Sequence, residues 1–466
     1  MKLRKNIILS IAAIVVFFAI AESVTRLFIP PGSYDYIERR AIEQNLSHKK
    51  AGDEFRILFY GESTMHGNQL YPKSTIDKWV KLYLKDLLPA DIADRVTTAN
   101  FGRLGAGSEF ISESVIETLS YKPDLIVVYM AHNDFVLVPI RRAFFRPKTF
   151  GERLEEFLEE IPKKSSFANA INRAYIKHKI NANANNPNQS FADDAWYSEN
   201  TQAYYTENDF LVPGSAHFTS IRKEFEKNSH KIIKAAKDKN APLVIFEAVS
   251  RWKGYEPVEP GEGRALDYYR IGEDYERQGN PKEANRYYEL ANDSDYFPIR
   301  APSCVNSFYE TIRESGAGGI HVIQTQKVFE QNSKNGIIDE ELILDPVHPT
   351  MEGQALMALE LVKIIYDKDM FAPKNEWNWV KARGFEAMKK NLDFDEESEF
   401  IMYLTSAQYV EKKYDKAAEF LEEAVKIKPD SIFANSWLAF CYSKMGQKEK
   451  AEEIYKKLSF PPLQKQ

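Results

Sequence analysis

The feature that most constrains the fold is an apolar run that ends in a sharp turn carrying a serine. Residues 55–60 read Phe-Arg-Ile-Leu-Phe-Tyr, a β-type run long enough for one buried strand. Gly61 permits tight backbone geometry, so that Ser63 is left at the carboxyl end of this strand. Open parallel sheets bind their ligands at that end. Such a turn is also common in proteins without catalytic function, so Ser63 is either a catalytic serine or an ordinary turn residue. Only other residues of the chain can distinguish these two interpretations.

From residue 55 onwards the chain alternates between strand-like and helix-like segments. This alternation predicts a parallel sheet that is covered by helices on both faces. We expect further strands at 96–100, 124–130, 242–246 and 321–324, and helices at 76–88, 217–238, 302–314 and 351–366. Ser108 is expected to cap one more helix, which follows Gly107. Two insertions, at about 136–215 and 255–300, interrupt the pattern.

The composition allows a large core and excludes several classes of function. With 466 residues, 44% of them hydrophobic, the chain is long enough for two or three domains. The net charge of -6 and the lack of Lys/Arg-rich blocks give no basic face for nucleic acid. Cys304 and Cys441 are the only cysteines and the eight histidines are scattered singly, so we expect no disulfide framework, no metal and no cofactor.

The first residues form a segment directed to the membrane. Three basic residues precede an apolar run from residue 7 to 21, which predicts a cytoplasmic N-terminus followed by an exported chain. The run spans about 22 Å, less than a bilayer core of about 30 Å, but a helix that continues to Ile29 removes the deficit. We therefore expect an uncleaved transmembrane helix within residues 1–29. A cleaved signal peptide is the alternative, because Ala19-Ile20-Ala21 fits a small-x-small cleavage site.

Polar groups suited to acyl transfer follow three of the predicted strands. Ester hydrolysis by a serine needs a nucleophile, a base, an acid that orients the base, and N–H donors for the oxyanion. Ser63 supplies the nucleophile, while Asp345 and His348, three residues apart in one loop, supply the orienting acid and the base. The Ser63 and Gly105 amides and the Asn133 side chain are candidates for the oxyanion hole. Taken singly, Asp345 equally fits a helix cap, and Asn133 a turn residue.

Four short blocks, in this order, resemble the SGNH (GDSL-like) hydrolase superfamily. They read Gly61-Glu62-Ser63, Asn100-Phe-Gly-Arg-Leu-Gly105, Ala131-His-Asn-Asp134 and Asp345-Pro-Val-His348. The resemblance implies a flavodoxin-like, three-layer α/β/α fold, a triad of Ser63, Asp345 and His348, and an oxyanion hole of Ser63, Gly105 and Asn133. Two departures are visible, because Glu62 replaces the usual Asp and Ala131 the usual Gly. Neither removes a reacting group, although the methyl group of Ala131 can crowd the backbone beside Asn133.

Three more polar residues are open to two interpretations each. His66 lies close to Ser63 in sequence, but a helical neighbour three residues away usually points away from the nucleophile, so we favour His348 as the base. His132 is expected to line the substrate cleft, with a solvated loop position as the alternative. Arg300, just before a predicted helix, is a candidate for binding an anionic or sugar group of the substrate; the alternative is an ordinary surface charge.

A repeat pattern adds helical hairpins to the sheet domain. Leu404, Ala417 and Leu421 return 34 residues later as Leu438, Ala451 and Tyr455, which is the period of the tetratricopeptide repeat (TPR). A further TPR-like match, in the insertion at 255–300, rests on a stripe formed by Ile271, Tyr275, Ala284 and Tyr288. Such a stripe first of all closes two helices on each other. Two tandem repeats are fewer than the three that usually stand alone, so we expect them to dock on the sheet domain or on the inserted hairpin.

These features predict a division into five regions: 1–29 an anchor, 30–54 a linker, 55–370 the SGNH-type domain, 371–394 a connector and 395–460 an all-α TPR-like domain. The predicted function is that of a membrane-anchored serine esterase, outside the cytoplasm, that acts on O-acyl esters of polysaccharide or lipid. An acyltransferase that passes the acyl group to a sugar is one alternative. A TPR-mediated interaction protein with an inert hydrolase domain is another. The expected partners are the ester substrate, the membrane and a protein bound by the repeats.

Overall fold

The computed structural model describes residues 34–67, 70, 73–136, 210–259, 263–381, 383–392, 395–410 and 413–458. The predicted anchor at 1–29 and most of the first predicted insertion lie outside these residues. Within the described ranges, no helix is both long enough and apolar enough to span a bilayer. The described helices and strands fall into two units, one containing α2 (Tyr34–Glu43) and one containing all the others.

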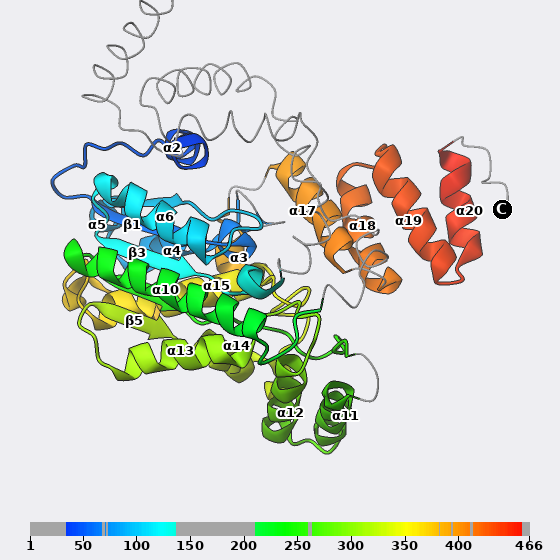
Figure 1. Cartoon of the computed structure of the whole chain (residues 1–466). Coiled ribbons are helices and arrows are strands. Elements are labelled where there is room, and N and C mark those ends of the chain that lie inside the picture. Colours follow the sequence, from blue (N-terminus) through cyan, green and yellow to red (C-terminus); the bar gives the residue numbers. More distant parts are fainter. Residues whose placement is uncertain are drawn as a thin grey trace, which may run out of the picture. The chain divides into compact units, whose positions relative to one another are not determined.

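The larger unit is built on a five-stranded parallel sheet with the strand order β2-β1-β3-β4-β5 (Figure 1). Its strands are β1 (Phe55–Gly61), β2 (Val96–Asn100), β3 (Leu125–Tyr129), β4 (Leu243–Phe246) and β5 (Ile320–Ile323). The pairing register places Gly61 beside Tyr129 and Phe59 beside Asn100, so the carboxyl ends of β1, β2 and β3 lie together. Because the chain continues from β1 to β2 on one side and to β3 on the other, this is the crevice where open α/β sheets bind ligands.

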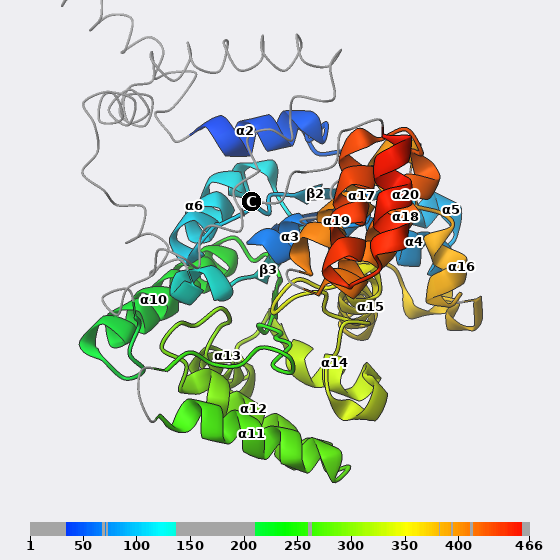
Figure 2. The same ribbon diagram turned by 90° about the vertical axis from the view of Figure 1, so that its right-hand side faces the viewer.

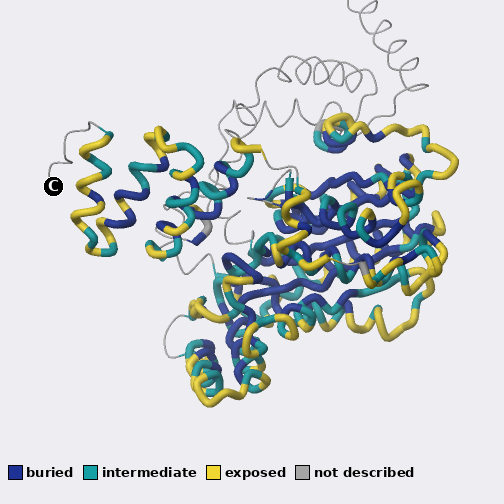
Figure 3. The backbone as a smooth tube through the Cα atoms, turned by 180° about the vertical axis from the view of Figure 1, so that it is seen from behind, coloured by how far each residue is buried: buried dark blue, intermediate teal, exposed yellow. Residues whose placement is uncertain are grey.

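Helices cover both faces of the sheet, because successive strand residues point to opposite faces. Ile57 and Phe59 are buried in a core with α4 (Ile76–Leu87) and α15 (Met351–Asp367). On the other face, the hydroxyl of Tyr60 bonds Thr118 of α6 (Ser108–Thr118) at 2.5 Å. That layer continues with α10 (Ala216–Asp238) and α13 (Ser303–Glu314), and Figure 3 shows the buried residues concentrated in the strands between the two layers. The expected α/β fold with a parallel sheet is confirmed.

Shorter elements connect these layers, and several were not expected. They are α3 (Ser63–His66), α5 (Ala90–Ala93), α14 (Thr325–Asn332), α16 (Phe385–Lys389) and the 3₁₀ turns Leu119–Tyr121, Lys334–Gly336, Lys374–Glu376 and Trp379–Lys381. Residues 371–394, expected to be a connector, contribute Ala372, Trp377 and Met388 to the same core as β1. This segment therefore packs on the sheet domain, because its few large apolar side chains are buried in the core that also contains β1.

The predicted cap of α6 is wrong in detail. Ser108 is the first residue of the helix, and the position before it is taken by Gly107. The carboxylate of Asp134 accepts hydrogen bonds from the Ser108 N–H at 3.0 Å and from the Ser108 hydroxyl at 2.6 Å. The Asp134 side chain thus accepts a hydrogen bond from an N–H group at the start of α6, the role that the Ser108 side chain was expected to fill.

A helical hairpin stands between β4 and β5, as the repeat pattern predicts. It consists of α11 (Arg264–Arg277) and α12 (Pro281–Asp293), which lie side by side in Figures 1 and 2. Its buried residues include Tyr269, Ala284 and Tyr288. Gly272 lets the helices approach closely, because a Cβ atom there would lie 2.7 Å from the Tyr288 ring. The buried stripe therefore starts at Tyr269, and Ile271 of the predicted stripe is only half-buried.

The C-terminal region is all helical. Its helices are α17 (Glu396–Tyr409), α18 (Tyr414–Ile427), α19 (Ile432–Lys444) and α20 (Lys448–Lys457), each packed on the next (Figure 2). Apolar residues at the predicted repeat spacing, Ala417, Leu421, Leu438 and Ala451, share one buried cluster. Leu344 of the sheet domain is buried in the same cluster, so the repeats dock on that domain as expected.

Candidate active site

Ser63 sits at a turn that only glycine permits. β1 ends at Gly61, and Ser63 is the first residue of the four-residue helix α3. A Cβ atom at position 61 would lie 2.3 Å from the carbonyl oxygen of Tyr129. This distance is too short for any side chain at that position. The turn therefore brings the backbone of β1 against β3 and leaves Ser63 half-buried at the crevice.

Three polar residues from two distant segments form a continuous chain of hydrogen bonds. His348 Nε2 lies 2.7 Å from the Oγ atom of Ser63. On the other side of the ring, His348 Nδ1 lies 2.5 Å from Asp345 Oδ2. This is the arrangement in which a serine can give its proton to an imidazole that a carboxylate orients. The partner of Ser63 is His348, as expected, and not His66.

Asp345 is buried but kept ionised by its partners. Its Oδ1 atom accepts hydrogen bonds from the Val347 and His348 N–H groups, both at 2.8 Å. Burial alone would raise the pKa of this carboxyl, but the charge and hydrogen bond of His348 and these N–H groups outweigh it, and the pKa is lowered. The carboxylate can therefore orient His348 Nδ1–H and stabilise a positive charge on this ring.

The loop that carries Asp345 and His348 is closed on itself and attached to the serine turn. Ile343 and Pro349 form an isolated antiparallel bridge, and the Leu344 N–H donates to the His348 carbonyl at 2.9 Å. Thr64, next to Ser63, donates its hydroxyl to the Val347 carbonyl at 3.1 Å. The local bridge sets the shape of the loop, and the Thr64 bond sets its distance from Ser63.

Glu62 holds the segment that contains Asn133. It is buried, and its two carboxylate oxygens accept the backbone N–H groups of Ala131, His132 and Asn133 at 3.2, 3.0 and 2.8 Å. Burial raises the pKa of Glu62 to about 8, and these N–H donors oppose the rise. The carboxylate of Glu62 thus meets this segment through its backbone N–H groups, including that of Ala131.

The other predicted oxyanion residues lie around the same turn. Gly105 has a φ of +66°, in the left-handed region that favours glycine, within the loop 101–107. The Arg103 N–H fastens this loop to the Gly61 carbonyl at 2.9 Å. The Asn133 side chain donates one N–H to the Ala106 carbonyl at 3.0 Å, and its amide carries a second N–H that this bond does not use.

His132 does not reach the substrate, and we correct that prediction. It is buried, its Nδ1 atom accepts the Ala301 N–H at 2.9 Å, and its Nε2 atom lies 2.7 Å from the Tyr129 hydroxyl. Burial and the nearby His348 lower the pKa of His132 to about 3, so the ring is neutral with its proton on Nε2. Its position behind β3 makes it a structural link between the sheet and residues 300–302.

Arg300 is likewise buried, which contradicts both its expected roles. Its Nε atom donates to Asn292 Oδ1 at 2.9 Å, and its Nη1 atom donates to the Arg251 carbonyl at 3.2 Å. The side chain is 2% exposed, so it is neither a substrate ligand nor a surface charge. Burial is possible because Asp295, also 2% exposed, lies 3.9 Å away and balances the charge. Arg300 connects the end of the inserted hairpin to the segment that follows β4.

Two residues that matter for the site were not predicted. The role of Glu62 was visible only as a departure from a motif, since no local pattern says which N–H groups a buried carboxylate will meet. Arg251, which follows β4, gave no signal, because an isolated arginine in a sequence usually lies on the surface. Among the described residues, no group of three or more His, Cys, Asp or Glu side chains is placed to hold a metal ion.

Comparison with known families now decides the class of protein. Residues 57–361, more than half of the chain, match the family model of the GDSL-like lipases/acylhydrolases. The chain belongs to the GDSL-like lipase/acylhydrolase family. This GDSL-like acylhydrolase is thus a serine hydrolase that acts on ester bonds, and the resemblance seen in its four sequence blocks is confirmed. Residues 411–460 match the tetratricopeptide repeat, which confirms the C-terminal repeat pattern.

Solved structures similar to this GDSL-like acylhydrolase include two hydrolases. One is a GDSL-like lipase from Bacteroides thetaiotaomicron VPI-5482, with 13% identity, 72% of this chain and 99% of that chain covered, and a TM-score of 0.34. The other is a catalytic mutant of an acetylxylan esterase from Geobacillus stearothermophilus, with 12% identity, 68% and 96% covered, and a TM-score of 0.33. At these scores the likeness adds no argument. No curated protein is similar enough to this sequence to be matched.

Proposed function

We propose that Ser63 is the nucleophile, His348 the general base and Asp345 the acid that orients it. The observation that supports this best is the unbroken chain of hydrogen bonds from Asp345 Oδ2 through His348 to Ser63 Oγ. In the first step Ser63 Oγ attacks the ester carbonyl carbon while its proton moves to His348 Nε2. That proton then passes to the leaving alkoxide as the C–O bond breaks. Water hydrolyses the resulting acyl-enzyme by the same route.

We propose further that the oxyanion is held by the N–H groups of Ser63 and Gly105 and by the Asn133 side chain. Support comes from the way their two loops are fixed. The Arg103 N–H ties the Gly105 loop to Gly61, and Glu62 holds the backbone of Asn133. Donors that are fixed before the reaction stabilise developing charge without reorganising, and one such donor is commonly worth about 10²–10³ in kcat.

For location and substrate, we propose a membrane-anchored enzyme with its catalytic domain outside the cytoplasm. The basic residues before the apolar run at 7–21 support this orientation. O-acyl groups on envelope or secreted polysaccharide are then the proposed substrates, followed by lipid esters. The full-length protein should fractionate with membranes and resist extraction by high salt, since an apolar helix is held by burial and not by charge. A soluble form that begins at Glu22 would replace the anchor with a cleaved signal peptide.

The decisive experiment compares single variants on an aryl acetate. Ser63→Ala and His348→Ala should each lower kcat by several powers of ten while the protein stays folded, because a triad acts as a unit. His66→Ala is the control, and its effect should be far smaller. A Ser63→Ala variant that keeps more than about a tenth of wild-type kcat would exclude Ser63 as the nucleophile. Adding acylated and free oligosaccharides to the same assay separates hydrolysis from transfer, since transfer yields a newly acylated sugar.

A further inference from the structure

The segment that leaves β4 runs alongside the loop of the catalytic acid and base. The Val249 N–H donates to the Tyr129 hydroxyl at 3.2 Å, and the Ser250 N–H donates to Gln326 Oε1 at 2.9 Å. The Arg251 N–H then donates to the Pro346 carbonyl at 2.9 Å. Each of these residues is thus fixed by a hydrogen bond, and the last bond reaches the residue directly after Asp345.

The Arg251 side chain bonds the same loop on the N-terminal side of Asp345. Its Nη1 atom donates to the Ile343 carbonyl at 3.0 Å, two residues before Asp345. Together with the backbone bond to Pro346, this brackets Asp345 on both sides. The guanidinium itself is only 2% exposed, and it could not be held there without partners.

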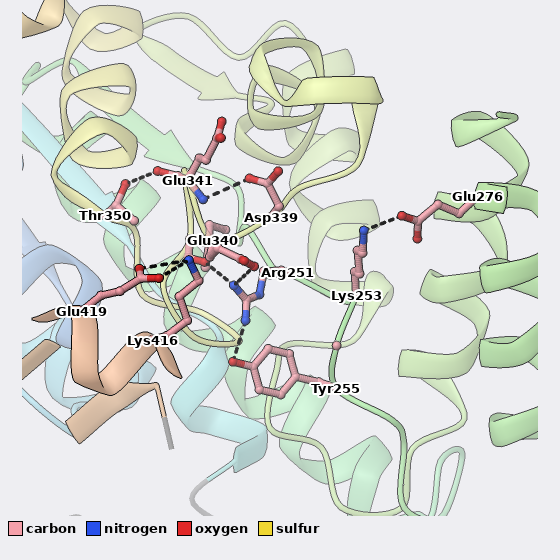
Figure 4. A network of polar contacts seen from close by, with 12 residues as sticks. Arg251, Lys253, Tyr255, Glu276, Asp339, Glu340, Glu341, Thr350, Lys416 and Glu419 are labelled. Atoms are coloured by element: carbon pink, nitrogen blue, oxygen red, sulfur yellow. Dashed lines mark hydrogen bonds and ion pairs between the residues drawn. The ribbon is translucent and has the colours of Figure 1, made fainter. Parts of the chain in front are cut away.

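Figure 4 shows the partners that orient the guanidinium of Arg251. Glu340 Oε2 lies 3.3 Å from Nη1, and the Tyr255 hydroxyl accepts from Nη2 at 2.8 Å. The centre of the guanidinium also lies 4.9 Å from the centroid of the Tyr255 ring. A planar group with several donors, held by a carboxylate, a hydroxyl and a ring face, has one orientation, which a lysine could not reproduce.

The inserted hairpin supports Arg251 from one side. Trp252 packs against the buried cluster of the hairpin, and Lys253 forms an ion pair with Glu276 of α11 (Figure 4). The Tyr269 hydroxyl accepts the Gly254 N–H at 2.7 Å. Together with the hydrogen bond from Arg300 to the Arg251 carbonyl, these contacts fix the position of the backbone at Arg251.

The C-terminal repeats meet the same loop from another side. Leu344, directly before Asp345, is buried among residues of α17, α18 and α19. The Nζ atom of Lys413 lies 5.7 Å from the centroid of the Tyr255 ring. Burial and the charge of Arg251 lower the pKa of this lysine. The loop therefore meets the C-terminal repeats through Leu344, and it is linked to the inserted hairpin through the segment that carries Arg251.

We propose that Arg251 is a positioning residue, which fixes the Asp345–His348 loop and connects it to the inserted hairpin and the C-terminal repeats. This inference rests on the proposed function of Ser63, Asp345 and His348. The bond from Asp345 to His348 is short, and a displacement of about 1 Å at a catalytic group commonly costs about 10²-fold in rate. Loss of the Arg251 side chain removes the bond to Ile343 and leaves the loop with fewer contacts, those of Pro346, Leu344 and Val347.

The test replaces Arg251 and follows two quantities that a purely structural residue would not change. In folded Arg251→Met, kcat for an aryl acetate should fall about 100-fold while KM changes less than about threefold. The strongly downfield proton resonance of the His348–Asp345 hydrogen bond should weaken or disappear. Arg251→Lys should recover part of both, because one ammonium can still donate to the Ile343 carbonyl. Arg286→Met is the matched control, because Arg286 is an exposed arginine that forms an ion pair with Glu283, and this variant should change neither quantity.

The outcome that overturns the proposal is a folded Arg251→Met protein with wild-type kcat and an unchanged downfield resonance. If that variant does not fold, Tyr255→Phe decides, because it removes only the hydroxyl that accepts from Nη2. It should lower kcat several-fold and weaken the resonance, and no change in either would equally overturn the proposal. A wild-type protein that hydrolyses no ester would count against the proposed function instead, while the resonance would still test the role of Arg251.

Discussion

The turn that carries Ser63 allows a quantitative prediction, because the distances around Gly61 show how far the backbone must move to accept one added methyl group. In Gly61→Ala, the new Cβ atom would lie 2.3 Å from the Tyr129 carbonyl oxygen and 2.6 Å from the Cβ atom of Met65. Ordinary contact begins at 3.4 Å, so the end of β1 has to move away from Tyr129 of β3 by about 1 Å. Ser63 follows two residues later and moves with the turn. A displacement of this size predicts a fall in kcat of about 100-fold, or about 2.7 kcal/mol of barrier.

The assay measures kcat on an aryl acetate together with the thermal midpoint of unfolding. Gly52→Ala is the matched control, because nothing lies within 4 Å of a Cβ atom at that position. It should leave both quantities unchanged. If Gly61→Ala keeps kcat within about threefold of wild type, the tight approach to Tyr129 does not set the position of Ser63, and the reasoning fails.

Two further variants test the carboxylates of the site. Asp345→Asn should lower kcat by about 10³–10⁴-fold without unfolding the protein, because an amide cannot both accept from His348 Nδ1 and stabilise its charged form. The control is Asp367→Asn, at an exposed position. A loss of kcat below about tenfold in Asp345→Asn would remove Asp345 from the triad. Burial raises the pKa of Glu62 from 4.5 to about 8, so the folded protein binds this proton more tightly than the unfolded chain. Its free energy of unfolding should therefore decline as the pH rises from about 4.5 to about 8, by at most about 1.4 kcal/mol per pH unit. Urea unfolding at several pH values should show a flatter profile for Glu62→Gln, and equal slopes in both proteins would contradict the assignment.

The elements with strong periodicity were predictable from the sequence. The parallel sheet follows from buried runs such as 57–60 and 125–129, whose apolar residues point to both faces. The grouping of Ser63 with Asp345 and His348 followed from their places after strands and from their resemblance to a family. A periodic pattern shows which side of an element is buried, and a motif shows which residue types recur, so both signals are local.

Residues whose roles depend on distant partners could not be predicted in this way. Arg300 and His132 carry polar groups that usually meet solvent, and only the folded chain shows that Asn292, Arg251 and Ala301 bond them inside the protein. The segment 371–394 has too few apolar residues for a clear pattern, yet it completes a core built elsewhere. Local sequence does not record which surfaces are left open by other elements.

The separation along the chain between Ser63 and His348 has a consequence for the order in which the site forms during folding. Ser63 and His348 are 285 residues apart, whereas Asp345 and His348 are three apart within a loop that closes on itself. Asp345 and His348 can therefore approach each other locally, but Ser63 joins them only after a loop of 285 residues has closed, a step that costs entropy and is slow. A partly synthesised chain that ends before Asp345 contains the serine turn without its hydrogen-bond partner His348. With the roles proposed for Ser63 and His348, hydrolysis begins only when the domain is complete, so a chain that is still being synthesised does not attack esters.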